Sequence, residues 1–564
     1  MNEIPPNWTI ADSDPRAVRA LASELRVPRI VASLLHTRGM SSPANARAFL
    51  QSLDIPLTDP LTMAGMSDAV ERIAKSRRQN EHVRVVGDYD VDGISGAALM
   101  VRALKRTGVE TVSYTIPHRL ADGYGLNVAI VERAAEEGVD LIVTVDNGTK
   151  SIEAVDRANA LGIDVIVTDH HTIDGELPRA AAIVNPRLDG PDHPCAAISG
   201  AGVALKVGAA LSGEHHDIGL AAMGTVSDIV TLLGENRAIV ARGIRELSSA
   251  AHPGITVLAQ RAGIDIADLR AEHIAFQLGP RINAAGRIGD PTVALRLLLA
   301  ESEGGCALMA EQLHAANEQR RRIESVITER AEVEAGRAVE AGHSIIVIGS
   351  RDWHQGVLGI VASKLVDRYH RPVVLVAFGE DGLGKGSGRS PSDFNLVEAI
   401  GNGQDLLVRF GGHRAAAGLT ITEENFGPFR ERMAAHAKGY DPSANGNSRV
   451  AVDAIASFSE IDPQLLHGID RLEPFGHGNP APVLCTFGVE IVPESVRELR
   501  GGHASFSARH DGRQVKVIAF GFGDKIPLRA LAGPADIAYT PKLNTWRGDT
   551  SIQLQLKDVV LASR

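Results

Sequence analysis

The sequence has few cysteines and no long apolar runs, and each shortage excludes a class of protein. Its three cysteines, Cys195, Cys306 and Cys485, lie far apart, which excludes a disulfide framework and the paired spacing of a zinc site. No apolar run is long enough for a membrane span, and the N-terminus lacks the basic start and apolar core of a signal peptide. We therefore expect a protein of the reducing cytoplasm without membrane association.

Size and charge describe a multidomain chain. At 564 residues it is too long for a single core, and the usual domain length predicts roughly three to five domains. The net charge of −11 argues mildly against a nucleic-acid partner. Affinity for phosphates nevertheless depends on where Lys and Arg lie rather than on their sum, so the charge distribution must decide.

Patterns along the chain divide it into five parts. A helical lead-in is followed by β-branched strands that alternate with helices, which predicts an α/β fold with a parallel, Rossmann-like sheet. A long charged helix then leads to a second α/β pattern, and a Ser-, Asn- and Gly-rich linker at 441–448 precedes short strands typical of a small β-barrel. The predicted parts are 1–60 (lead-in), 61–290 (first α/β domain), 291–340 (connector helix), 341–440 (second α/β domain) and 446–564 (barrel).

The stretch VVGDYDVDGISG, residues 85–96, places Asp88, Asp90 and Asp92 at every second position directly after an apolar run. Such a run is typical of a buried strand, and open α/β sheets bind ligands at the C-terminal ends of their strands. Carboxylates this close either raise one another's pKa or share cations, and hard divalent metals favour oxygen clusters. The alternative is an acidic, solvated loop, because Asp-rich turns are common.

Two later strands end in the same way. Asp146 follows one of them, the run Asp169, His170 and His171 follows the next, and Asp228 lies in a helical segment beyond. A lone histidine is more often structural than ligating, but the shared position at strand ends favours a site. Mixed carboxylate and imidazole ligands suit Mn²⁺ or Mg²⁺ better than zinc, and two such cations sharing a carboxylate would stabilise an in-line attack on phosphorus.

These motifs resemble a known family. GDYDVDG, VDNG, TDHH and SDIV, in that order, are similar to the motifs of the DHH phosphoesterases. From about residue 50 onward the chain further resembles the RecJ family within them, through IPHRLADGYG (116–125), GPRINAAGRIGDP (279–291), RFGGHRAAAGLT (409–420) and LEPFGHGNPAPVL (472–484).

The resemblance implies a DHH catalytic domain at 61–290, a DHH-associated domain at 341–440, an OB-fold at 446–564 and a catalytic ring closed by the connector helix. It also implies single-stranded DNA as the substrate, with a RecQ-type helicase and a single-stranded-DNA-binding protein as partners. We expect the enzyme to be a monomer that uses two Mn²⁺ or Mg²⁺ ions.

Site residues can be assigned where this chain matches the family motifs. The implied metal ligands, with Asp146 as the bridge and Asp88 in a supporting role, are Asp88, Asp90, Asp92, Asp146, His170 and Asp228. Asp169 is a second supporting carboxylate, and His171 would contact the scissile phosphate or the leaving oxygen, or orient a neighbour. Some relatives carry a histidine where this chain has Val86, so one cation would have a thinner ligand shell here.

Substrate binding requires other residues, because single strands are held in basic grooves. Arg119, Arg281 and Arg287 supply guanidinium forks in segments that also contain Gly or Asn, although surface arginines in loops are the alternative. The motif favours Arg281 for stabilising charge in the transition state, with Tyr124 and Asn283 as accessory contacts.

A glycine-rich stretch further along the chain is a candidate for binding the 5′ end. GKGSGRS, residues 384–390, resembles a small phosphate nest in which Lys385, Ser387 and Arg389 face an anion, and a flexible linker is the alternative. His413 and Arg414 would contact the strand backbone, unless the glycines beside them only pack a tight turn.

The predicted barrel contains several aromatic residues, namely Phe506, Phe520, Phe522, Tyr539 and Trp546. OB-folds use such rings as stacking platforms for bases, but we expect most of these rings to lie in the core.

The resemblance as a whole implies processive removal of 5′ mononucleotides from single-stranded DNA by metal-activated water, in recombination and repair. The alternatives are a DHH-type oligoribonucleotide or cyclic-dinucleotide phosphodiesterase, and a catalytically inactive DNA-binding scaffold. The terminal barrel and LEPFGHGNP disfavour the first, and the complete acidic and histidine motifs disfavour the second.

Overall fold

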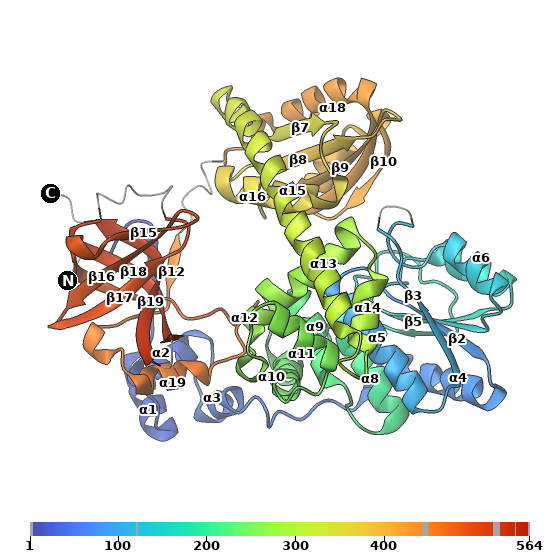
Figure 1. Ribbon diagram of the computed structural model, residues 1–564, viewed down its shortest axis with the longest axis horizontal. Coiled ribbons are helices and arrows are strands. Elements are labelled where there is room, and N and C mark those ends of the chain that lie inside the picture. The colour runs from blue at the N-terminus through green and yellow to red at the C-terminus, as the bar shows by residue number, and fades with distance from the viewer. Residues whose placement is uncertain (1–3, 120–121, 443–448, 523–530, 547–548, 562–564) are drawn as a thin grey trace.

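The computed structural model describes the chain except for residues 1–3, 120–121, 443–448, 523–530, 547–548 and 562–564. Figure 1 shows an α/β domain with a large helical part, a second α/β domain reached through one long helix, and a barrel beside the N-terminal helices. Most of the predicted linker and the side chain of Trp546 lie outside the described part. Among the described helices, none is long and apolar enough to cross a membrane.

A parallel five-stranded sheet in the order β3-β2-β4-β5-β6 forms the centre of the first α/β domain, as the alternating pattern predicts. Alternate strand residues enter two separate cores, with Val85 and Val143 on one face and Ile142 and Val165 on the other, because helices cover both faces. The elements are α4 (Met66–Gln79), β2 (His82–Val86), α5 (Val91–Arg106), β3 (Thr111–Thr115), α6 (Val128–Glu136), β4 (Leu141–Thr144), α7 (Ile152–Ala160), β5 (Asp164–Thr168) and β6 (Ala182–Val184).

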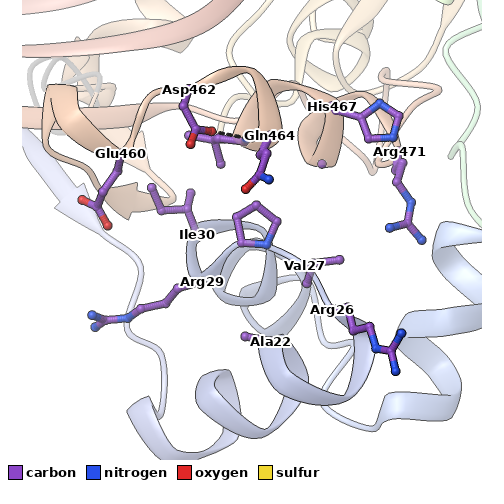
Figure 2. A pocket seen from close by; sticks show the side chains of 13 residues that line it. Ala22, Arg26, Val27, Arg29, Ile30, Glu460, Asp462, Gln464, His467 and Arg471 are labelled. Atoms are coloured by element: carbon purple, nitrogen blue, oxygen red, sulfur yellow. Dashed lines mark hydrogen bonds between the residues drawn. The ribbon is translucent and has the colours of Figure 1, made fainter.

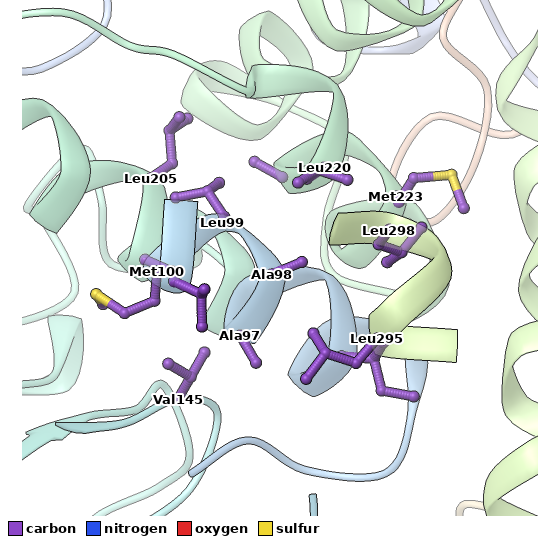
Figure 3. Packing of buried hydrophobic residues seen from close by; sticks show 14 of the residues in the cluster. Ala97, Ala98, Leu99, Met100, Val145, Leu205, Leu220, Met223, Leu295 and Leu298 are labelled. Atoms are coloured by element: carbon purple, nitrogen blue, oxygen red, sulfur yellow. The ribbon is translucent and has the colours of Figure 1, made fainter. Parts of the chain in front are cut away.

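The helical part of this domain packs around α5. Figure 3 shows Ala97 and Leu99 of α5 among apolar side chains from later helices, including Leu205, Leu220 and Leu295. Small residues on α5 let its neighbours approach closely, and this contact fixes the N-terminus of α8 beside the strand ends. The helices are α8 (Gly200–Ser212), α9 (Ile218–Ser227), α10 (Gly234–Ser248), α11 (Pro253–Arg261), α12 (Ala271–His273), a π-helix (Ile274–Leu278), α13 (Gly279–Ile288) and α14 (Thr292–Leu299).

One long helix, α15 (Cys306–Glu340), joins the two α/β domains (Figure 1). Leu313 lies in the core of the first domain, whereas Ile327 and Ala335 lie in a core of the second, so the helix belongs to both. The second domain has a mixed sheet in the order β10-β11-β9-β8-β7. Its elements are β7 (Ile346–Ser350), α16 (Leu358–Tyr369), β8 (Val373–Phe378), β9 (Leu383–Arg389), α17 (Leu396–Gly401), β10 (Leu407–Gly412), β11 (Ala416–Thr422) and α18 (Glu423–His436).

The C-terminal part is a seven-stranded, partly closed sheet in the order β13-β14-β18-β19-β17-β16-β15, with β14 also pairing with β16. Phe506, Phe522 and Tyr539 are buried in it, whereas the side chain of Phe520 is 49% exposed, which confirms the expectation that most of these rings lie in the core. Its elements are β12 (Val450–Val452), β13 (Ala454–Ile455), α19 (Pro463–Asp470), β14 (Leu484–Ile491), β15 (Arg497–Leu499), β16 (His503–His510), β17 (Arg513–Ala519), β18 (Gly533–Trp546) and β19 (Asp549–Leu561).

The N-terminal elements pack against this barrel. Strand β1 (Trp8–Ile10) pairs in parallel with β12, and the helices α1 (Pro15–Leu25), α2 (Arg29–Thr37) and α3 (Pro43–Leu50) share one apolar core with α19 and the barrel strands. A pocket of about 570 Å³ lies between α1, α2 and α19, lined by cationic and acidic side chains such as Arg26, Arg471 and Glu460 (Figure 2). The first and last of the five predicted parts therefore form one packing unit, although the boundaries themselves remain predictions.

Candidate metal centre and phosphate pocket

The carboxylates of the opening motif lie in the turn between β2 and α5. Asp90 caps α5, because its Oδ1 accepts hydrogen bonds from the backbone N–H groups of Asp92 (2.9 Å) and Gly93 (3.1 Å). A Cβ at Gly93 would lie 2.5 Å from the backbone nitrogen of Asp88, so only glycine allows this turn to close. The turn brings all three aspartates to the C-terminal edge of the sheet, as the sequence predicts.

Two neighbouring strands and the C-terminal end of α9 deliver the remaining candidate ligands to the same edge. Asp146 follows β4 with a φ of +64°, and His170 follows β5. The Nε2 atom of His170 lies 3.1 Å from Asp146 Oδ1, 3.6 Å from Asp228 Oδ2 and 3.9 Å from Asp92 Oδ2. Asp92 also accepts hydrogen bonds from the backbone N–H groups of Gly200 (2.6 Å) and the next residue at the start of α8, which orient its carboxylate.

The geometry and the unsatisfied atoms of this cluster fit divalent cations. The cluster contains three sets of residues, and within each set the potential ligand atoms lie within 4.8 Å of one another. The sets are Asp92, His170 and Asp228; Asp88, Asp90 and Asp146; and Asp146, His170 and His171. Asp88 Oδ1, Asp146 Oδ1 and His170 Nε2 are buried, and none of these atoms has a hydrogen-bond partner among the described residues. Buried polar atoms without partners are expected at metal sites, because the ion satisfies them. Asp146 belongs to two sets, the arrangement that a bridging ligand requires.

The electrostatics of the cluster point the same way. Burial and the charges of neighbouring aspartates raise the pKa of Asp92 to about 7 and that of Asp228 to about 8. The same causes raise the pKa of Asp88 and of Asp146, whereas burial lowers the pKa of His170 to about 4. A bound cation would stabilise the ionised carboxylates and the neutral imidazole together.

His171 forms a pair with Asp169 at the edge of the cluster. Its Nδ1 lies 2.7 Å from Asp169 Oδ1. Burial alone would lower the pKa of His171, but this hydrogen bond and the nearby carboxylates outweigh burial and raise it. For Asp169 the effects have the opposite sign: burial alone would raise its pKa, but its hydrogen bonds with His171 and Thr149 outweigh burial and lower it. Tyr124 completes the group, because its hydroxyl donates to the backbone oxygen of Asp146 (2.9 Å) and lies 3.3 Å from His171 Nε2.

A pocket of about 320 Å³ lies where the second α/β domain faces the first. Arg119 comes from the first domain, and Lys385, Ser387 and Arg389 come from β9 of the second. The Arg119 guanidinium lies over the ring of Tyr89, 5.0 Å from its centroid, and Tyr89 belongs to the opening motif. The pocket is therefore cationic and joins directly onto the carboxylate turn.

The stretch 384–390 is not the predicted nest, because most of it lies in β9, a strand paired on both sides with β8 and β11. Its glycines alternate on the packed face: a Cβ at Gly384 would lie 2.6 Å from Val376 Cγ1, and a Cβ at Gly386 would lie 2.7 Å from Leu419 Cδ1. The intervening residues, Lys385, Ser387 and Arg389, line the pocket. The predicted nest and the alternative flexible linker were both wrong, but the three predicted polar residues do lie together.

The arginine motif of α13 divides its residues between different tasks. Asn283 accepts a hydrogen bond from the backbone N–H of Val91 (3.1 Å) and so supports the carboxylate turn. Arg287 donates to the backbone oxygen of Gly356 (3.4 Å), next to the pocket residue Gln355, and burial and the charges of Arg119 and Arg320 lower its pKa to about 10. Arg281 instead donates to the backbone oxygen of Gln277 (2.7 Å) and to His314 of α15 (3.3 Å), and this geometry gives no support to a contact with the scissile phosphate.

The remaining predicted residues lie on the hairpin between β10 and β11. Arg414 donates to the backbone oxygens of Ser392 (3.0 Å) and Asp393 (3.2 Å), so its guanidinium holds a neighbouring loop, and His413 is exposed. Two further residues belong to this region without having been predicted: Gln355 lines the pocket, and the charge of Arg320 acts on Arg287. No local motif marks either residue, and Arg320 lies in the helix predicted to be a connector.

Three family models match this chain in succession. The "DHH family, N-terminal domain" model matches residues 82–226, the "DHHA1 domain" model matches 342–439, and the "RecJ OB domain" model matches 452–558.

Similar proteins cover nearly the full chain. The single-stranded-DNA-specific exonuclease RecJ of Bacillus subtilis is 34% identical over 98% of this chain and 71% of its own length, and that of Thermus thermophilus is 35% identical over 90% and 73%. The crystal structure of Thermus thermophilus RecJ in complex with Mn²⁺ matches with a TM-score of 0.83 and 31% identity, over 99% of this chain and 80% of that one. A structure of the same protein with Mg²⁺ has a TM-score of 0.76 at 30% identity, over 99% and 79%. With these domains in this order and relatives at this level of identity, the chain belongs to the RecJ family of DHH phosphoesterases.

Proposed function

We propose that the chain is a single-stranded-DNA-specific exonuclease that removes 5′ mononucleotides in the 5′-to-3′ direction by metal-dependent hydrolysis, in DNA recombination and repair. The observation that carries the proposal is the carboxylate and histidine cluster with shared ligand atoms, directly beside a cationic pocket. The names of the relatives and their Mn²⁺ and Mg²⁺ complexes support it.

The cluster offers two neighbouring cation positions. Asp92, His170 and Asp228 would hold one cation, Asp88 and Asp90 the other, and Asp146 would contact both. Two bound Mn²⁺ or Mg²⁺ ions would polarise the scissile phosphodiester and lower the pKa of the attacking water.

Protein groups beside the cations would handle the leaving oxygen. Asp169 orients His171 and favours its charged form, so Nε2 would carry a proton that it can donate to the departing 3′ oxygen. Tyr124 lies against the same ring and would fix its position.

The cationic pocket would set the polarity of cleavage. A 5′-terminal phosphate carries more negative charge than an internal diester, and it can accept charge-assisted hydrogen bonds from Arg119 and Arg389 as well as one from Ser387. Arg287 would add positive charge between this pocket and the cluster. We assign to Arg287, in place of Arg281, the stabilisation of charge in the transition state.

The surroundings of the enzyme are also part of the proposal. We place it in the cytoplasm as a monomer that works with a RecQ-type helicase and a single-stranded-DNA-binding protein. Among the barrel rings that the structure describes, Phe520 is exposed and suits stacking against a base.

One assay tests the activity. DNA labelled at the 5′ or the 3′ end, single-stranded or duplex, is incubated with Mn²⁺ or with EDTA. We expect labelled mononucleotide at the earliest times only from 5′-labelled single strands with Mn²⁺. Early release from the 3′ label, or equal degradation of duplex, would contradict the proposal, and binding without any cleavage would favour an inactive scaffold.

A further inference from the structure

The motif LEPFGHGNP forms a turn, residues 472–480. This turn packs against the segment of chain that comes shortly after Asp228. A Cβ at Gly476 would lie 2.6 Å from Leu232 Cδ1, and a Cβ at Gly478 would lie 2.5 Å from Thr231 Cγ2. The backbone N–H of Leu232 donates to the oxygen of His477 (2.8 Å). Both glycines are therefore required for this close contact, and the 472–480 turn holds the backbone three and four residues beyond Asp228.

The 472–480 turn is itself rigid. Asn479 is fully buried, and its side-chain nitrogen donates to the backbone oxygens of Leu472 (2.9 Å) and Pro474 (2.8 Å). Gly476 and Asn479 also exchange backbone hydrogen bonds of 2.9 Å and 3.1 Å. These bonds define one conformation of the turn, so it can act as a fixed support.

Side chains from two other parts of the molecule, the first domain and the N-terminal helices, anchor the turn. Arg237 of α10 is 1% exposed and donates to the backbone oxygens of Phe49 (3.1 Å), Leu472 (3.1 Å) and Glu473 (2.7 Å). Arg38 of the N-terminal helices bonds to Asn479, and Arg270 of the first domain pairs with Glu473. The N-terminal helices, the barrel connection and the first domain thus meet at this turn.

The segment that carries Asp228 requires such a support. Helix α9 ends at Ser227, and Ile229 has a φ of +60°, a conformation that a β-branched residue rarely adopts. The Ile229 side chain is 70% exposed, so its own packing does not stabilise this conformation. A strained backbone persists only where the surrounding structure over-determines it, and strain of this kind is concentrated at functional sites.

From this geometry we infer that the 472–480 turn is a positioning element for Asp228, and that it makes cation binding depend on how the barrel is seated on the first domain. The inference rests on the proposed function in taking Asp228 as a cation ligand. Asp228 Oδ2 lies 3.6 Å from His170 Nε2, so a small displacement of residues 229–232 would move one ligand of a shared set.

The test uses the full chain and measures Mn²⁺ binding from the electron paramagnetic resonance signal of the free ion. Gly478→Ala should weaken Mn²⁺ binding by about 10- to 100-fold, the usual effect of losing an outer support of a metal ligand. Excess Mn²⁺ should restore most of the nuclease activity.

Matched variants separate positioning from simple strain. Gly478 has a φ of +74° and Gly488 has a φ of +65°, but a Cβ at Gly488 would meet nothing within 4 Å, so Gly488→Ala carries the backbone strain alone and should bind Mn²⁺ normally. Adding Thr231→Ser to Gly478→Ala removes the Cγ2 atom that the new Cβ would meet, and this should restore most of the lost affinity.

Four outcomes would overturn the inference. Normal Mn²⁺ binding by folded Gly478→Ala would do so, as would equal losses in Gly488→Ala and Gly478→Ala. If Gly478→Ala does not fold, Arg270→Ala is the milder variant, because it removes a partly exposed anchor, and unchanged Mn²⁺ binding would count against the inference. Asp228→Asn separates a failure of the ligand assignment from a failure of the positioning role alone. If this variant binds Mn²⁺ normally, Asp228 is not a cation ligand, and the inference fails with that assignment.

Discussion

Replacing Asp146 by asparagine distinguishes a bridging metal ligand from an acid that is merely buried. Asp146 has a φ of +64°, and asparagine also tolerates this left-handed conformation, so Asp146→Asn changes the charge with little change in backbone strain. Nuclease activity should fall by about 10³-fold or more, because Lewis-acid stabilisation contributes several kcal/mol and each 1.4 kcal/mol is about tenfold in rate. Binding of single-stranded DNA should change by less than about threefold, because the arginines proposed to contact phosphates remain.

The stability of the metal-free protein should move in the opposite direction. Burial and four neighbouring aspartates raise the pKa of Asp146, so its charge is unfavourable in the absence of a cation. A neutral amide at this position removes that unfavourable charge, so the variant should stabilise the metal-free fold. Thermal unfolding in EDTA should therefore show a Tm a few degrees above wild type, and Mn²⁺ should raise the Tm of wild type much more than that of the variant.

The control is Asp367→Asn, which neutralises an exposed aspartate on α16 and should leave activity and both Tm values unchanged. Nuclease activity of Asp146→Asn within about tenfold of wild type would refute the two-cation assignment. A lower metal-free Tm with an undiminished Mn²⁺ effect would show that Asp146 is a structural acid.

Other predictions test the pocket, the packing and the path of the strand. Arg389→Ala should lower kcat/KM for 5′-phosphorylated ends by about 10- to 100-fold, matching the 1.5–3 kcal/mol of a charge-assisted hydrogen bond, and for 5′-hydroxyl ends far less. Arg409→Ala, at an exposed position of β10, is the control, and equal losses on both ends would place the 5′ pocket elsewhere. Gly224→Ala should reduce nuclease activity about 100-fold. The new Cβ would lie 2.2 Å from Asp92 Oδ1 and would displace this carboxylate, and a displacement of about 1 Å at an active site lowers the rate by about this factor. Gly208→Ala, whose nearest neighbour would be 3.3 Å away, should remain active, and equal activities of the two variants would argue against a tightly packed Asp92. Linear single strands should be degraded while closed circles and blunt duplexes resist, and appreciable cutting of circles would contradict the threading of a 5′ end.

The metal cluster follows from the sequence alone because its signals are local. Apolar runs that end in Asp or His define both the strands and the groups at their ends, and parallel strands necessarily bring these ends to one edge. The sequence therefore suffices to predict that Asp90, Asp146 and His170 lie together, and the cluster contains all three. The choice of Mn²⁺ or Mg²⁺ likewise follows from ligand chemistry rather than from the fold.

Other features depend on contacts between distant segments, and these are visible only in the folded molecule. The glycines at 384 and 386 favour a phosphate nest or a flexible linker when considered alone. In the folded molecule they lie in β9, which pairs with β8 and β11, and the side chains of Val376 and Leu419 occupy the space that a Cβ would need. The sequence likewise could not distinguish Arg281 from Arg287, because only the packing of α13 directs Arg281 to His314 of α15 and Arg287 to the backbone oxygen of Gly356 beside the pocket. Nor does any local pattern show that residues near the two ends of the chain share a core, since apolar stripes specify that a face is buried but not which partner covers it.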